Sequence, residues 1–182
     1  MHGAARLLVV LAVLCLAVAS LGAVQAGTAA TKPTRSISVA PELETEILVE
    51  LNAIRRAHGL RPLRASSPLG TAARAHSRAM AQHGFFRHES RDGSVFWKRV
   101  QRYYGPGGYA TWSVGENLLW STTGLDAKRA VRLWMESPGH RKNILTPRWR
   151  EVGLSAVVAA AAPGVYGGRD VVIVTSDFGV RL

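Results

Sequence analysis

The stretch Ser137-Pro138-Gly139-His140-Arg141-Lys142-Asn143-Ile144-Leu145 follows a helical segment that ends in Trp134-Met135-Glu136. It is the last of three polar segments set in apolar surroundings. The first is Phe85-Phe86-Arg87-His88-Glu89-Ser90 and the second is Val114-Gly115-Glu116-Asn117-Leu118. Each segment lies at the boundary of an expected helix or strand. A fold that brings these boundaries together would place two imidazoles and a carboxylate in one cleft.

Three residues in these segments are the candidates for chemistry: His88, Glu116 and His140. A carboxylate inside an apolar, strand-like segment is costly to bury alone, so Glu116 either has a partner in the cleft or accepts bonds from nearby backbone amides. The spacing of His140 and Asn143 places both on one face of a helical turn. Asn143 therefore either supports the cleft or caps the turn. We expect Asn117 to bond local backbone.

A metal ion would need all three candidates, because the chain contains neither His-x-x-x-His nor His-Glu-x-x-His. Two imidazoles and one carboxylate suit zinc or another divalent cation and leave a coordination position for water. The alternative is a cleft whose polar residues are only structural. There is no Gly-x-Ser-x-Gly motif, so the usual serine hydrolase pattern finds no support.

The N-terminus has the pattern of an export signal. A weakly basic lead precedes an apolar run over residues 7–18, and Val24-x-Ala26 supplies the small residues that a signal peptidase needs. We therefore expect residues 1–26 to be a signal peptide, with a retained membrane anchor as the alternative. The only cysteine, Cys15, lies in this run, so the mature protein would have no disulfide.

The formal net charge is +11, which favours attraction to an anionic partner such as a polymer of the cell envelope. Basic residues are spread along the chain without an aromatic-interleaved basic motif, so we expect no nucleic-acid binding. These features predict a secreted, periplasmic or envelope-associated protein, which we expect to be monomeric and, once the signal peptide is removed, without a transmembrane anchor.

The order of predicted elements indicates the fold class. Residues 27–40 are polar and rich in Thr, Ser and Ala, which predicts a disordered linker before a folded domain over 41–182. Helical patterns follow near residues 41–58, 67–83, 94–104 and 126–136, the last opened by a capping box, Thr123-x-x-Asp126. The segment from Trp112 to Trp120 is strand-like, with an interruption at Gly-Glu-Asn. Residues 151–161 and 170–178 predict a final strand pair. Helices followed by strands indicate an α+β domain.

Together the three polar segments resemble the bacterial branch of the CAP superfamily, which includes cysteine-rich secretory proteins, antigen 5 and plant pathogenesis-related proteins. The supporting motifs are Phe86-Arg87-His88 with Asp92-Gly93, Gly115-Glu116-Asn117-Leu118, Ser137-x-Gly139-His140-Arg141-x-Asn143-Ile144-Leu145, and the ending Ser176-Asp177-Phe178-Gly179. The resemblance implies an SCP domain with a three-layer α-β-α sandwich.

The resemblance also implies a cleft that holds two histidines and acidic residues, which binds zinc or another divalent ion in several members. By position these are His88, His140 and Glu116, supported by Asn117, Ser137 and Asn143. Ser137 stands where eukaryotic members often carry a second acid, so a metal site here would be completed differently.

Members of this family differ in activity, so three functions remain open. The first is a binding module for a lipid, sterol, envelope polymer or divalent metal. The second is a metal-assisted hydrolase of cell-wall, peptide or ester substrates, with Glu116, His88 and His140 as its catalytic candidates. The third is an interaction domain with a structural cleft. The sequence favours the first and leans away from an enzyme.

Overall fold

Apolar, β-branched residues near the C-terminus form the two long strands at the centre of the sheet. β4 (Glu151–Ala162) and β5 (Arg169–Arg181) pair antiparallel and are joined through a 3₁₀ turn, η1 (Gly164–Tyr166). β3 (Trp112–Thr122) lies antiparallel on the other side of β5. The computed structural model describes residues 35–122 and 124–182, so the predicted signal peptide and the first part of the predicted linker lie outside the described residues.

The sheet order is β1-β4-β5-β3, and two short strands share the outer side of β4. β1 (Ser36–Val39) pairs antiparallel with the end of β4, and β2 (Arg64–Ala65) pairs parallel with its beginning. The two short strands do not meet, because they pair with residues 157–160 and 151–152 of β4 respectively. Among the described residues, no strand pairs on that side with the stretch of β4 between them.

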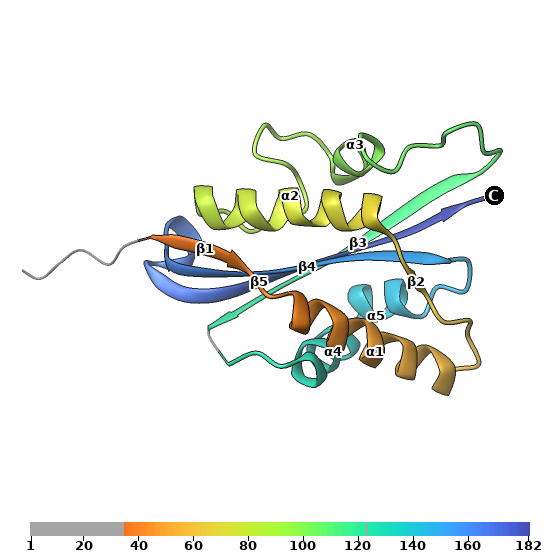
Figure 1. The fold of residues 1–182 in the computed structure, drawn as a ribbon, viewed down its shortest axis with the longest axis horizontal. Coiled ribbons are helices and arrows are strands. Elements are labelled where there is room, and N and C mark those ends of the chain that lie inside the picture. Colours follow the sequence, from red (N-terminus) through yellow and green to blue (C-terminus); the bar gives the residue numbers. More distant parts are fainter. Residues whose placement is uncertain (1–34, 123) are drawn as a thin grey trace, which may run out of the picture. The chain divides into compact units, whose positions relative to one another are not determined.

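Helices cover both faces of this sheet (Figure 1). α2 (Ser67–His83) and α3 (Phe96–Gln101) lie on one face, and α1 (Pro41–Ala57), α4 (Ala127–Glu136) and α5 (Pro138–Ile144) lie on the other. The predicted three-layer α-β-α sandwich is therefore confirmed. None of the helices within the described ranges combines the length and the apolar character needed to cross a membrane.

Each helical layer buries its own apolar side chains against the sheet. Trp134 of α4 packs with α1 and with Phe178 of β5, and its indole N–H donates to the Leu118 carbonyl at 3.1 Å. On the opposite face, α2 packs so closely on β4 that only glycine fits at position 153. A Cβ there would lie 2.0 Å from the backbone of Leu69 and Gly70.

Several expectations about boundaries were wrong. The predicted linker over 27–40 ends early, because Ser36–Val39 forms β1 and Ile37 packs against the core. The predicted interruption at Gly-Glu-Asn is absent, since β3 runs unbroken through these residues. The helix predicted over 94–104 is shorter, at Phe96–Gln101.

The start of α4 also differs from the prediction. Asp126, rather than Thr123, is the N-cap residue, and its carboxylate accepts a bond of 2.7 Å from the Arg129 N–H. Thr123 itself lies outside the described residues. Of the two histidines on α2, His76 is buried and His83 is exposed.

Candidate functional site

Glu116 is the centre of the candidate site. It lies on β3 directly opposite Asp177 of β5, and its side chain is fully buried. One carboxylate oxygen, Oε1, accepts a bond of 2.8 Å from His88 Nδ1, and the other, Oε2, is paired with the guanidinium of Arg99. Both oxygens are therefore engaged within the protein, which explains how a carboxylate is tolerated in an apolar strand.

Arg99, on α3, holds this arrangement together. Its side chain is only 7% exposed, so the ion pair with Glu116 is shielded from water. Its Nη1 also donates to the His88 carbonyl at 3.2 Å and to Ser90 Oγ at 3.1 Å. One guanidinium thus fixes both the carboxylate and the loop that carries His88. Sequence reasoning did not identify Arg99, because no local motif reveals that α3 would pack over β3.

One ring nitrogen of His88 is hydrogen-bonded to Glu116, and the side chain is otherwise partly exposed to solvent. Its side chain is 47% exposed. An ionised carboxylate can only accept, so Nδ1 must be the protonated nitrogen that donates to Glu116. In the neutral tautomer this leaves the Nε2 lone pair free. The hydrogen bond to Glu116 is the main reason that the pKa of His88 is raised above its ordinary value.

His140 lies on α5, and its backbone carbonyl accepts a bond from Asn117, the residue next to Glu116 on β3. Burial, followed by the positive charge on His88, lowers the pKa of His140. The pKa values of the two imidazoles therefore shift in opposite directions. The cleft therefore combines a histidine that favours its protonated form with one that favours its neutral form.

α5 is fixed to the outer edge of β3 by two asparagines. Asn143 Nδ2 donates to the Glu116 carbonyl at 3.0 Å and to Asn117 Oδ1 at 2.8 Å, while Asn117 Nδ2 donates to the His140 carbonyl at 3.1 Å. A Cβ on Gly115 would lie 3.1 Å from Asn143 Oδ1. Asn117 and Asn143 thus tie α5 to β3 at Glu116 and Asn117, and their predicted role as cleft support stays a prediction.

Ser137, which stands where eukaryotic members often carry a second acid, connects two helices in this structure. It is the single residue between α4 and α5, where its N–H donates to the Trp134 carbonyl at 3.2 Å and its carbonyl accepts from the Arg141 N–H at 2.8 Å. Its side chain does not cap α5. Its role as cleft support stays a prediction.

Asp177 is a further acidic group that sequence reasoning did not assign to the site. It is fully buried beside Glu116, and its carboxyl oxygens have no hydrogen-bond partner among the described residues. Burial, and then the negative charge of Glu116, raise the pKa of Asp177 well above its ordinary value. The raised pKa favours the neutral form of Asp177, in which case the positive charge of Arg99 has only the negative charge of Glu116 to balance. The strand pattern places Asp177 in β5, but only the register reveals its neighbour.

One of the three predicted metal ligands, Glu116, is already bonded within the protein. Within the described ranges, no group of three or more His, Cys, Asp or Glu side chains is arranged to hold one ion. The chemical reason is that Glu116 is already bonded to Arg99 and His88. Of the three predicted ligands, His88 Nε2 and the ring of His140 are the groups that remain as donors.

Comparisons with known proteins agree with this fold. Residues 48–177 match the family model of the cysteine-rich secretory protein (CAP) family. The chain therefore belongs to the cysteine-rich secretory protein family. It is 35% identical over 115 residues to the uncharacterised protein YkwD of Bacillus subtilis, an alignment that covers 63% of this chain and 42% of YkwD. The membrane protein YlbC of the same organism, also uncharacterised, is 31% identical over 111 residues, covering 61% and 30%.

Solved structures show the same fold. An extracellular protein with an SCP domain from Bacillus anthracis has a TM-score of 0.58 and 27% identity, covering 78% of this chain and 41% of that one. An outer surface protein of Borrelia burgdorferi has a TM-score of 0.64 and 17% identity, covering 82% and 100%. This chain thus spans less than half the length of both Bacillus subtilis relatives and of the Bacillus anthracis protein.

Proposed function

We propose that this protein is a binding module that acts at or outside the cell envelope, with the cleft between His88 and His140 as its binding site. The observation that carries the proposal is that both oxygens of Glu116 are already bonded, one to Arg99 and one to His88. In this role Glu116 orients His88, and the imidazoles are the groups that contact the ligand.

A divalent cation such as zinc is the ligand that this chemistry favours. Histidines that bind metals usually donate their second ring N–H to a carboxylate, which fixes the tautomer and raises the basicity of the ring. The bond from His88 Nδ1 to Glu116 has this form. His140 would supply a second nitrogen, and it favours the neutral form that coordination requires. Water or a group on a partner would complete the coordination.

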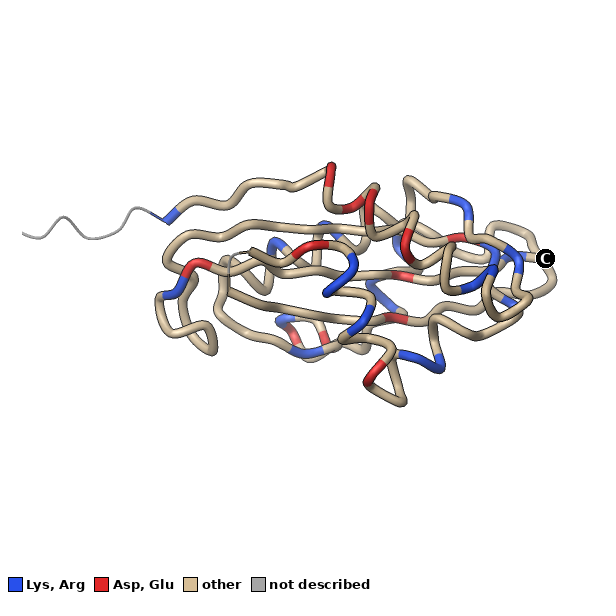
Figure 2. Tube along the Cα trace, turned by 90° about the horizontal axis from the view of Figure 1, so that it is seen from below, with Lys and Arg blue, Asp and Glu red and all other residues tan. Residues whose placement is uncertain are grey.

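Location outside the cytoplasm is supported by several weaker observations. The N-terminal pattern predicts an export signal, and the similar protein of Bacillus anthracis is described as extracellular. The net charge of +11 favours an anionic envelope polymer or lipid surface as partner. Lys and Arg positions are scattered along the described chain and are not gathered into one stripe (Figure 2), which favours broad attraction over a defined nucleic-acid groove.

A hydrolase is less well supported by the same geometry. A general base must be able to reach a proton on water or substrate. Glu116 would first have to leave Arg99 and His88, which would leave a buried arginine without its partner.

The test is metal uptake by the purified protein, measured by calorimetric titration with zinc chloride after treatment with a chelator. We expect saturable uptake that is lost in His88→Ala/His140→Ala. His58→Ala is the matched control, because His58 is exposed at the end of α1 and its ring bonds a backbone carbonyl of the same helix, that of Ile54. Equal uptake by the wild type and the double variant, or none by either, would contradict the metal proposal.

The role of Glu116 can be tested in the same titration. If Glu116 only orients His88, the Glu116→Gln variant should bind zinc about 10–100-fold more weakly but should still bind it. Loss as complete as in the histidine double variant would instead indicate that Glu116 is a direct ligand. Circular dichroism of the variant checks that the fold is intact.

The envelope proposal needs a separate measurement. Sedimentation with vesicles of phosphatidylglycerol should carry the protein down at low salt and release it at high salt, since the attraction is electrostatic. Vesicles of phosphatidylcholine are the uncharged control. Equal sedimentation with both kinds of vesicle, or with neither, would count against attraction to an anionic surface.

A further inference from the structure

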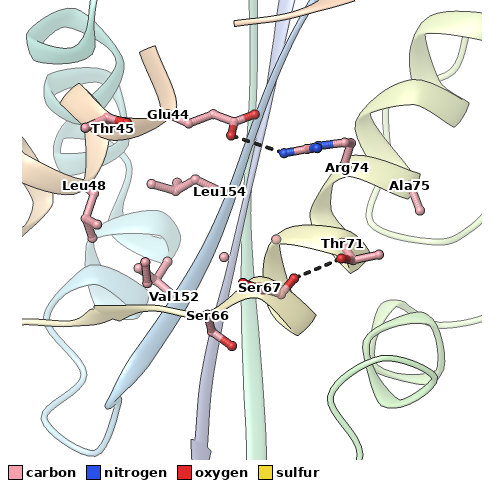
Figure 3. A pocket seen from close by; sticks show the side chains of 13 residues that line it. Glu44, Thr45, Leu48, Ser66, Ser67, Thr71, Arg74, Ala75, Val152 and Leu154 are labelled. Atoms are coloured by element: carbon pink, nitrogen blue, oxygen red, sulfur yellow. Dashed lines mark hydrogen bonds and ion pairs between the residues drawn. The ribbon is translucent and has the colours of Figure 1, made fainter. Parts of the chain in front are cut away.

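A cavity lies along the outer side of β4, at the opposite edge of the sheet from β3, which carries Glu116. It has a volume of about 610 Å³ and is bounded by the N-terminal halves of α1 and α2 and by the outer side of β4 (Figure 3). Its main wall residues are Glu44, Leu48, Ser66, Gly70, Arg74 and Leu154. The volume is within the range of pockets that hold small ligands.

The cavity lies at a gap in the edge of the sheet. β1 covers β4 at residues 157–160 and β2 covers it at residues 151–152, so no described strand covers the outer side of residues 153–156. Backbone groups in a strand that face an edge need partners, since an unpaired N–H or C=O away from water is unfavourable.

Two of the outward-facing residues in this region have such partners. The Val152 carbonyl accepts from the Ser66 N–H at 2.9 Å. The Ala156 carbonyl accepts from the Ala40 N–H at 2.9 Å, and the Ala156 N–H donates to the Glu44 carboxylate at 3.0 Å. Backbone groups alternate in direction along a strand, so the N–H and carbonyl of Leu154 face the same side. No described residue forms the corresponding bonds with Leu154.

The walls add apolar and charged contacts around this open position. The side chains of Leu48, Val152 and Leu154 are apolar, and Figure 3 shows Glu44 and Arg74 facing each other above them. These two form an ion pair at 3.5 Å, in which the Arg74 side chain is 47% exposed. An exposed guanidinium can also receive a carboxylate from a ligand.

We propose that this cavity binds a short extended peptide. One residue of the peptide would pair with the N–H and carbonyl of Leu154 and so complete the sheet edge between β1 and β2, as peptides do when they add a strand to an exposed edge. An apolar side chain of the peptide would contact Leu48 and Val152, and its terminal carboxylate would lie near Arg74. This site is independent of the proposed histidine cleft, so either proposal can fail without the other.

The test is a titration of the ¹⁵N-labelled protein with the peptide acetyl-Ala-Leu-Ala-Ala, followed by NMR. The amide signals of Gly70, Gly153 and Leu154 should shift and saturate. Methylation of the peptide nitrogen that pairs with Leu154 removes its donor and leaves a carbonyl unpaired. Of peptides methylated at each internal nitrogen in turn, at least one should therefore bind about ten- to a hundredfold more weakly. Absence of saturable shifts at these amides, or equal binding by all methylated peptides, would overturn the proposal.

Gly70→Leu provides the matching change in the protein. A Cβ at position 70 would lie 3.8 Å from the Leu154 carbonyl oxygen, an ordinary contact, so the longer side chain can fill the cavity without displacing backbone. We expect at least tenfold weaker binding of the peptide. The control is Gln82→Leu, which adds the same side chain at an exposed position of the same helix. Unchanged affinity in a folded Gly70→Leu variant, or equal loss in both variants, would refute the site.

Discussion

Replacement of Arg99 by methionine tests whether the Arg99–Glu116 pair organises the site. The side chain of Arg99 is 7% exposed and that of Glu116 is fully buried. Arg99→Met therefore leaves a buried carboxylate without its cation. Removal of one partner from a buried ion pair typically costs about 3–5 kcal/mol. The bonds from Arg99 to the His88 carbonyl and Ser90 Oγ are lost as well, which places the expected loss in the upper part of that range.

The loss can be measured by urea unfolding followed by tryptophan fluorescence. For a domain of this size, about 4 kcal/mol corresponds to a fall in Tm of roughly 10–15 °C. Arg132→Met is the matched control, because the Arg132–Glu136 pair is 3.9 Å long and exposed on both sides. That variant should lose less than about 0.5 kcal/mol. A loss below about 1 kcal/mol in Arg99→Met, or similar losses in both variants, would refute the reasoning.

Three further changes test other parts of the structure. Burial raises the pKa of Asp177 and so favours its neutral form, and Asp177→Asn should therefore change the unfolding free energy by less than about 1 kcal/mol; a loss above about 3 kcal/mol in urea unfolding would contradict this. Gly153→Ala should destabilise by about 3 kcal/mol or more because its Cβ meets the backbone of α2, whereas the control Gly70→Ala should not, and equal calorimetric melting temperatures would contradict this packing. Burial lowers the pKa of His76 to about 4, so the unfolded state binds the proton first and stability should fall by up to about 3 kcal/mol as the pH drops from 6.5 to 4. His76→Gln should flatten this pH dependence in urea unfolding, and an unchanged slope would show that another group is responsible.

Much of the fold could be predicted because its signals are local. The helix predicted over 67–83 matches α2, since a proline near its start and an alanine-rich stripe define it within a single segment. The strand pair near residues 151–161 and 170–178 was likewise marked by β-branched residues on either side of a turn that begins at Pro163-Gly164. β1 was missed because its pairing with β4 depends on residues more than a hundred positions away.

The candidate site could be predicted only in part, because some of its contacts join residues that are distant in the sequence. His88, Glu116 and His140 could be selected because each stands out in an apolar context, and the structure brings His88 and Glu116 into direct contact. Arg99 and Asp177 could not, since their roles depend on strand register and on the packing of α3 over β3. These two residues change the interpretation of Glu116 from an available ligand to an orienting group.

The pKa of His88 directly tests whether Glu116 orients His88, because the two side chains are hydrogen-bonded. If Glu116 accepts from His88 Nδ1, the bond stabilises the imidazolium, and the pKa of His88 lies above 6.5. His88 then contributes stability that is fully present below pH 6.5 and is lost as the pH rises through its folded pKa.

The most direct measurement is an NMR titration of the histidine ring nitrogens in the wild-type protein and in Glu116→Gln. We predict a His88 pKa above 6.5 in the wild type, a lower value in the variant, and Nδ1 as the protonated nitrogen of the neutral ring. A His88 pKa that is at or below 6.5 in the wild type, or that does not fall in Glu116→Gln, would contradict the claim that Glu116 orients His88.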